Sequence, residues 1–256
     1  MTFLDRTTAT VQYTTNVSKQ ALKDLWVTCF PEDGDGFAAA FLRDYFRPEQ
    51  GVCIQQDGEV QSALYMLPCT YRVGDKTGEL LYIYAMCTHP HHRRKGNLRA
   101  MLEFVWKHCI ERGIHGMVLH ALDTSKGVVE DFGMKPILTR EAGDWALPEE
   151  TGWVKCSGDF ETFYRLRTQH LDAKPAAILW PRRELAFIYE DLRRNGKMTF
   201  FQNAAGELSY CAEDETDRPK GSALSQNQRY CAHIKMVDGT LTEEEQAALY
   251  FNLLLK

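Results

Sequence analysis

The sequence predicts an α/β protein with a mixed sheet, and three patterns support this prediction. The apolar stretch Leu81–Cys87 is typical of a strand, and a helical stripe follows from about Asn97 to Arg112. Two further strand-like stretches, Gly51–Gln56 and Glu59–Leu67, flank an Asp-Gly pair, which suits a tight hairpin turn. Strands and helices of this kind are also interspersed along the rest of the chain, which favours helices packed on a sheet.

The composition is that of an ordinary globular protein. Of 256 residues, 44% are hydrophobic and 25% are charged, and the net charge is −5. This charge gives no reason to expect binding to nucleic acid or to an anionic membrane. No stretch approaches the ~20 apolar residues that cross a bilayer. The start of the chain lacks a signal-peptide pattern, so we expect a cytoplasmic protein. The eight scattered cysteines form no Cys-x-x-Cys pair and favour free thiols.

The first half is expected to open with a short strand and two helices and to close with a strand–helix–strand unit. Its remaining elements are a strand at Val11–Tyr13, helices at Lys19–Phe30 and Phe37–Phe46, a strand at Met117–Ala121, a short helix ending at Phe132 and a strand at Gly133–Ile137.

The second half partly repeats this order. We expect helices at Phe160–His170 and Arg182–Arg194, then a hairpin of Lys197–Asn203 and Glu207–Ala212. The interpretation is two domains, residues 1–145 and 146–256, although chance recurrence of common elements is the alternative. A loop at Asp214–Gln228, a strand at Cys231–Val237, a capping box at Thr240 and Glu243 and an ordered C-terminus complete the prediction.

The strand, turn and helix around residue 90 predict an anion site. The first N–H groups of a helix have no partner inside the helix, and the helix dipole favours negative charge there. Arg93, Arg94 and Lys95 add positive charge at the same place. A solvated basic turn is the alternative, and the flanking strand and helix favour a phosphate or pyrophosphate site.

The stretch Pro90–Leu98 resembles the acetyl-CoA loop of the GNAT acetyltransferases, written Arg/Gln-x-x-Gly-x-Gly/Ala. Arg93 and Gly96 match its first two fixed positions, and Leu98 stands where a second Gly or Ala is usual. The Gly-x-Leu-Arg ending is similar to the enhanced-intracellular-survival group of tandem GNAT acetyltransferases. The resemblance covers roughly residues 10 to 140 and implies a GNAT fold, followed by a degenerate GNAT-like or accessory half without its own cofactor.

The resemblance implies that acetyl-CoA is the co-substrate. Backbone N–H groups of about Arg94 to Leu98 would hold the pyrophosphate, and a side chain at Gly96 would obstruct the phosphates. Backbone N–H groups of Met86 to Thr88 would polarise the thioester carbonyl, with ordinary sheet pairing as the alternative. The residues expected to bind the cofactor are Met86, Cys87, Thr88, Arg93, Arg94, Lys95, Gly96, Asn97 and Leu98.

The residues that move protons are less defined. Tyr84 and Tyr82 are the catalytic candidates on the amine side and are expected to share one face of their strand with Met86. A tyrosine with its ordinary pKa of about 10 is a poor base, so packing is their alternative role. The tyrosine that many GNAT enzymes use as the acid corresponds to Val129. Three alternatives stay open: another residue protonates the leaving thiolate, the thiolate leaves without a proton, or the protein is not catalytic.

The leading hypothesis is an N-acetyltransferase that moves an acetyl group from acetyl-CoA to a primary amine in a ternary complex. The acceptor would be a small molecule or a peptide amine; its identity, the acyl preference and the oligomeric state stay open. The alternative is a catalytically silent acyl-CoA-binding or sensing module of the same fold. His89, His91 and His92 are expected to face solvent or phosphate, and no metal is expected.

Overall fold

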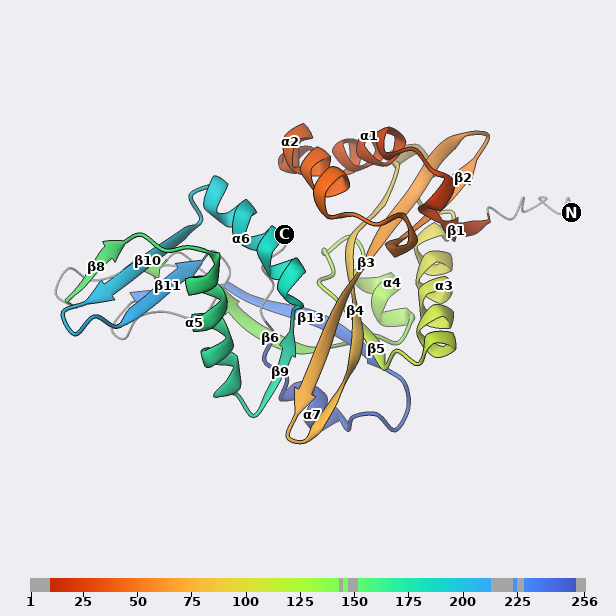
Figure 1. Ribbon diagram of the computed structural model, residues 1–256. Coiled ribbons are helices and arrows are strands. Elements are labelled where there is room, and N and C mark those ends of the chain that lie inside the picture. Colours follow the sequence, from red (N-terminus) through yellow and green to blue (C-terminus); the bar gives the residue numbers. More distant parts are fainter. Residues whose placement is uncertain (1–9, 143–144, 147–151, 213–222, 225–227, 252–256) are drawn as a thin grey trace, which may run out of the picture. The chain divides into compact units, whose positions relative to one another are not determined.

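The computed structural model describes residues 10–142, 145–146, 152–212, 223–224 and 228–251 (Figure 1). The chain divides into two compact units, and each is described by itself. The first unit consists of Met1–Pro68, Leu80–Lys135 and Lys235–Val237, and the second of Cys69–Glu79, Pro136–Ile234 and Asp238–Lys256. Strands β3 and β4, which form the hairpin joined at Gly74, therefore contribute residues to both units.

The first unit is built on a mixed sheet. Its strands are β1 (Val11–Tyr13), β2 (Gly51–Gln56), β3 (Glu59–Val73), β4 (Lys76–Thr88) and β5 (Gly116–Leu119), which neighbour one another in that order. The β1–β2 and β2–β3 pairs are antiparallel, whereas β4 and β5 are parallel. Asp57 and Gly58 both have positive φ, at 52° and 83°, as the predicted hairpin turn requires.

Helices cover both faces of this sheet. They are α1 (Lys19–Cys29), α2 (Gly34–Ala40), which continues as a π-helical turn over Phe41–Tyr45, α3 (Asn97–Arg112) and α4 (Lys126–Asp131). On one face, Met101, Leu102 and Val105 of α3 lie in a buried cluster with alternate residues of the strands, including Leu81 and Ile83. On the other face, Trp26 of α1 and Phe41 pack against Tyr65 of β3.

The second unit contains a separate three-stranded sheet. The sheet has the order β8 (Trp153–Cys156), β10 (Met198–Asn203), β11 (Leu208–Ala212), and α5 (Phe160–Asp172) and α6 (Arg182–Arg194) contact β11 and β10 respectively. Strand β9 (Ala176–Leu179) pairs with Thr70–Val73 of β3. The other elements are β6 (Lys135–Ala142), β7 (Trp145–Ala146), β12 (Ala223–Leu224), β13 (Gln228–Met236) and α7 (Glu243–Ala247).

The mixed-sheet α/β prediction is confirmed, with a second sheet and helices in addition, and three local expectations were wrong. Strands β8 and β9 were missed, because four-residue strands carry little alternation to read. The strands expected at Glu59–Leu67 and Leu81–Cys87 are longer, as β3 and β4, and a tight turn at Gly74 joins them. The capping box is formed by Thr242 and Glu245, where the helix starts, and not by Thr240 and Glu243. Residues 252–256 and most of the predicted loop at 214–228 lie outside the described residues.

Candidate functional site

Strand β4 carries an irregularity at Ala85, where φ is +45°. A non-glycine residue in this region is uncommon and marks a bulge that shifts the side-chain alternation by one position. Tyr84 packs on Trp26 of α1, as the regular pattern predicts, but Met86 packs against the α3-side cluster on the opposite face. The expectation that Met86 shares a face with Tyr82 and Tyr84 is therefore wrong, because the bulge at Ala85 reverses the alternation.

The pairing of β4 with β5 ends just before this bulge. The parallel ladder between β4 and β5 covers Leu81↔Met117 to Ile83↔Leu119 and ends there in the described part of the chain. Beyond the bulge, His89 N–H donates to Gln61 O of β3 at 2.9 Å. Successive N–H groups of a strand point to opposite edges, so those of Thr88 and Met86 point away from β3. These two N–H groups face the side where β5 no longer pairs. An N–H group that polarises a substrate carbonyl must likewise be free of a strand partner.

Helix α3 begins at an uncapped, left-handed turn. Gly96, at its N-cap, has φ +85°, and Arg94 has φ +62°. No side chain of the described residues caps this helix, and its first internal bond is Ala100 N–H to Gly96 O at 3.0 Å. The backbone N–H groups of Asn97, Leu98 and Arg99 precede that bond and so lack a partner within the helix.

The structure adds a second reason for glycine at position 96. A Cβ built there would meet no described protein atom within 4 Å, so the position is open. The positive φ by itself favours glycine, because a side-chain-bearing residue adopts it only under strain, and obstruction of the phosphates by a side chain there stays a prediction. Leu98, the departure from the usual loop, is half-buried and packs against the first unit's core cluster. Its side chain is directed into the core, which explains why leucine is tolerated there.

A chain of three polar side chains ties the start of α3 to the sheet. Asn97 Nδ2 donates to Ser62 Oγ at 2.9 Å, and Ser62 Oγ donates to Thr88 Oγ1 at 3.0 Å. Asn97 and Ser62 are buried, while Arg93 Nε donates to the carbonyl of Thr88 at 3.1 Å from the exposed side. Position 88 is therefore held to both ends of the loop. Sequence reasoning missed Ser62, since a serine inside an apolar strand carries no signal of a partner 35 residues away.

Two thiols and the Arg93 guanidinium meet next to the loop. Because the bulge moves Cys87 to the α1 side, its thiol donates a hydrogen bond to Cys29 at the end of α1. That bond lowers the pKa of Cys29, burial opposes the change, and the charge of Arg93 lowers the pKa further. The pKa of Cys87 is well above its ordinary value because of the same bond and of burial. Cys29 is half-buried, so the more acidic thiol is also the more accessible one.

Tyr82 and Tyr84 lie in a buried aromatic cluster. Each is 3% exposed, and their rings stack at 6.0 Å between centroids. Tyr84 also contacts Trp26 and Phe41, with centroids 5.6 Å away in both cases. These contacts account for both tyrosines as packing residues, and a catalytic role for either stays a prediction.

Two further residues, near β5 and in α4, bear on the proton chemistry. Val129 is fully buried in the core cluster of the first unit, so its position supplies no proton. Asp123 pairs with Lys126 at 2.9 Å on the surface, and that hydrogen bond and charge, with a smaller contribution from His120, lower the pKa of Asp123. Asp123 is therefore a carboxylate with a partner, which does not favour it as a base.

The fold and this strand–bulge–turn–helix arrangement define an acyl-CoA N-acyltransferase fold. The sequence matches the acetyltransferase (GNAT) domain family over residues 10–137, which contain the whole site described above. The chain belongs to the GNAT acetyltransferase family. No curated protein matches the chain in the comparison of sequences.

Solved structures of similar fold extend the likeness over most of the chain. A GCN5-related N-acetyltransferase from Anabaena variabilis ATCC 29413 has a TM-score of 0.65 at 12% identity, covering 89% of this chain and 73% of that one. Eis1 from Mycobacterium abscessus has a TM-score of 0.64 at 9% identity, covering 90% and 74%. A probable N-acyltransferase from Enterococcus faecalis V583 has a TM-score of 0.63 at 9% identity, covering 93% and 73%. At these identities the likeness shows the fold alone.

Proposed function

We propose that this GNAT-family protein is an N-acetyltransferase that moves the acetyl group of acetyl-CoA to a primary amine. One observation carries the proposal: the part of β4 beyond Ala85, where no described pairing with β5 continues, leads directly into the uncapped, basic start of α3. An acyl-CoA needs both features, because its pyrophosphate is an anion and its thioester carbonyl becomes an oxyanion during transfer.

In the proposed complex the pyrophosphate accepts hydrogen bonds from backbone N–H groups at the start of α3. Asn97, Leu98 and Arg99 supply the first of these, and the helix dipole favours the charge. Arg94 and Lys95 are exposed and add positive charge close to the phosphates. Asn97 has a second role, since its side chain fixes the helix start to Ser62 of β3.

The thioester lies along β4, with its carbonyl directed at the N–H groups of Met86 and Thr88. The amine nitrogen attacks the carbonyl carbon, and the resulting oxyanion accepts hydrogen bonds from these groups. The C–S bond then breaks, the electron pair leaves with the CoA sulfur, and the amine loses a proton to the base. Because the reaction is a direct attack, both substrates are bound at once and no acyl-enzyme forms.

The proton steps must differ from those usual in the family, because the residue that usually serves as the acid is a valine here. Val129 stands at the position of the usual acid, so the CoA sulfur leaves as a thiolate, which a thiol pKa of about 8.5 allows. Tyr84 and Tyr82 are the nearest sequence candidates for the amine side. Because both phenols are buried and are poor bases, the amine proton passes through water to the departing CoA thiolate, which becomes the CoA thiol.

The proposed acceptor is a small-molecule amine or a peptide amine, taken up from an aqueous compartment, for which we propose the cytoplasm. No described helix is long and apolar enough to cross a membrane. The net charge of −5 gives a slight preference for cationic amines.

Two measurements test the proposal in sequence. Isothermal titration of the folded chain with acetyl-CoA should give saturable binding, and absence of binding at millimolar ligand would contradict it. Thiol release from acetyl-CoA is then followed across a panel of small cationic amines and peptide amines. Turnover that depends on one amine class supports the N-acetyltransferase and names its acceptor.

A catalytically silent acyl-CoA-binding module is the second candidate, and Val129 is the observation that favours it. In this alternative the loop holds the cofactor while no residue manages the protons. Saturable acetyl-CoA binding without thiol release for any amine would select this alternative. Steady turnover with one amine excludes it.

A further inference from the structure

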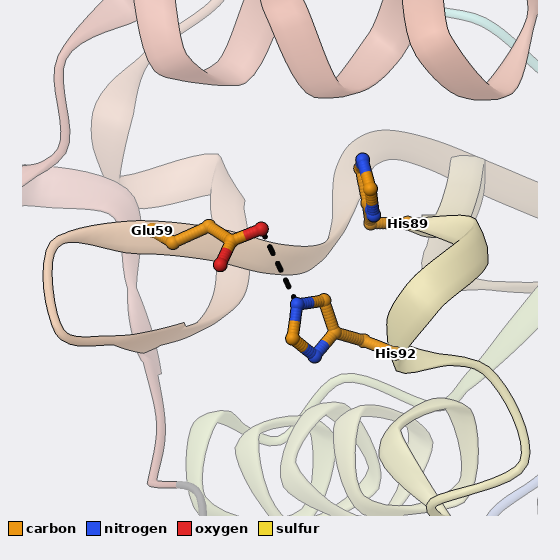
Figure 2. A group of neighbouring side chains, drawn as sticks. All are labelled: Glu59, His89 and His92. Carbon is orange, nitrogen blue, oxygen red and sulfur yellow. Dashed lines mark hydrogen bonds and ion pairs between the residues drawn. The ribbon is translucent and has the colours of Figure 1, made fainter.

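Three side chains from two separate stretches of the chain converge beside the loop. Glu59 begins β3 directly after the hairpin turn, while His89 and His92 follow the end of β4. The hydrogen bond from His89 N–H to Gln61 O aligns these two strand ends. As a result, one carboxylate oxygen and one ring nitrogen from each histidine lie within 4.8 Å of one another (Figure 2).

We propose that Glu59, His89 and His92 form a binding site for a Zn²⁺ ion. Two imidazole nitrogens and one carboxylate are donors that Zn²⁺ accepts, with water in the fourth position, and imidazole disfavours Mg²⁺ and Ca²⁺. His92 Nε2 already lies 3.2 Å from Glu59 Oε1, and the dashed line in Figure 2 marks this interaction. This site does not depend on the proposed acetyl transfer.

The distances fit after small side-chain rotations. Bonds of about 2.1 Å in a tetrahedral site place donor atoms about 3.4 Å apart, so the Glu59–His92 pair already matches, and each separation to the His89 donor must shrink by at most about 1.4 Å. The side chain of Glu59 is 55% exposed and that of His92 16% exposed, and His89 is half-buried. Glu59 can therefore turn toward the ion, and a turn of His89 exchanges its long hydrogen bond from His91 N–H, at 3.4 Å, for the bond to the ion.

Positively charged side chains lie near the three residues, and one of them, Lys95, contacts His92. Lys95 Nζ lies 3.3 Å from His92 Nδ1, and Arg93 and Arg94 follow His92 in the chain, so the local field opposes a cation. Lys95 is exposed and can move away. Once His92 binds the ion through Nε2, its Nδ1 carries the proton and no longer accepts from Lys95. Zn²⁺ binding thus releases the Lys95 ammonium from His92.

His91 offers a matched control within the same turn. Its ring lies 5.2 Å from that of His89, yet it is not one of the three converging residues. An exposed histidine that binds metal nonspecifically would contribute from this position as readily as from positions 89 and 92. Zn²⁺ binding to the half-buried thiol of Cys29 must also be distinguished from binding at the proposed site, because thiolates bind Zn²⁺.

The test is isothermal titration of Zn²⁺ into the full chain with its thiols kept reduced. We expect one saturable site, weakened more than about tenfold in His89→Ala, His92→Ala and Glu59→Gln, and unchanged in His91→Ala and Cys29→Ser. Thermal unfolding without metal checks that each variant is folded.

Co²⁺ substitution gives an independent reading of the ligands. A four-coordinate site of nitrogen and oxygen donors gives visible d–d bands without an intense thiolate charge-transfer band, and these bands should vanish in the His89→Ala/His92→Ala double variant. No saturable Zn²⁺ binding, equal weakening in His91→Ala, loss in Cys29→Ser, or binding retained in the double variant would overturn the proposal.

Discussion

The start of α3 and the start of α5 differ in how their first backbone N–H groups are hydrogen-bonded. Both helices begin with backbone N–H groups that lack a partner inside the helix. In α5, the carboxylate of Asp159 accepts a hydrogen bond from Thr162 N–H at 2.8 Å, so the helix closes its own end. In α3, no described side chain does this, and the turn before it is basic. Hence α3 is left suited to an external anion, and α5 is not.

The largest effect is expected from Gly96→Val. A β-branched residue is strained at φ +85°, by about 1–3 kcal/mol, so the turn would change conformation and the first N–H groups of α3 would no longer converge on one anion. Acetyl-CoA affinity, measured by isothermal titration, should fall by at least about tenfold, which corresponds to about 1.4 kcal/mol.

Gly127→Val is the matched control for this change. Gly127 lies in α4 at an ordinary φ, and a Cβ there meets no described atom within 4 Å. Affinity for acetyl-CoA should be unchanged in this variant. Equal losses in the two variants would mean that the loop conformation is not what holds the ligand.

Asn97→Ala should have the next largest effect. It leaves the buried Ser62 hydroxyl without its donor, at a cost of about 1–3 kcal/mol in the free energy of unfolding. Chemical denaturation measures this, and acetyl-CoA binding should weaken as well because the helix start loosens. Arg99→Ala, which removes only an exposed pair with Glu103, should change stability by less than about 0.5 kcal/mol. Equal stability of the two variants would contradict the anchoring role.

Cys29 can report whether an anion occupies the start of α3. Its thiol, with a pKa lowered by the Cys87 hydrogen bond and by Arg93, should react with iodoacetamide faster than Cys53 or Cys109. Burial raises the pKa of those two thiols to about 11 and about 12. Saturating acetyl-CoA should slow labelling of Cys29, because the phosphates compensate the charge of Arg93, and leave Cys156 in β8 unaffected. Mass spectrometry of the labelled peptides measures both rates.

The smallest effect is expected at the self-capped helix. Asp159→Ala should lower Tm by a few degrees and leave acetyl-CoA affinity unchanged, while Asp159→Asn, which also caps, should retain most of the stability.

Hydrogen bonds from the backbone and side chain of Thr162 lower the pKa of Asp159 below its ordinary 3.8. The contribution is therefore fully present above pH 3.8 and lost as the pH falls through the lowered pKa. A Tm difference that does not shrink on acidification would contradict this.

The sequence determined the elements whose limits are set by local chemistry. Helix α3 was predicted from residue 97 to residue 112, because Gly96 and Gly113 bracket its apolar stripe, and both adopt positive φ in the structure. The hairpin at Asp57-Gly58 and helix α6 follow from equally local signals. The Arg93 and Gly96 positions likewise predicted the loop as a candidate cofactor site without any tertiary contact, since a motif is a property of adjacent residues.

Only the tertiary structure decided what the loop is placed against. Nothing in the sequence indicates that Ala85 adopts a positive φ. Its bulge nevertheless places Met86 on the α3 side of the sheet and Cys87 on the α1 side, each the reverse of what regular alternation predicts. Ser62 and Glu59 reach the loop because β3 and β4 pair in one register. A register is fixed by the packing of the whole sheet rather than by any one stretch, and the candidate site depends on that register as much as on its motif.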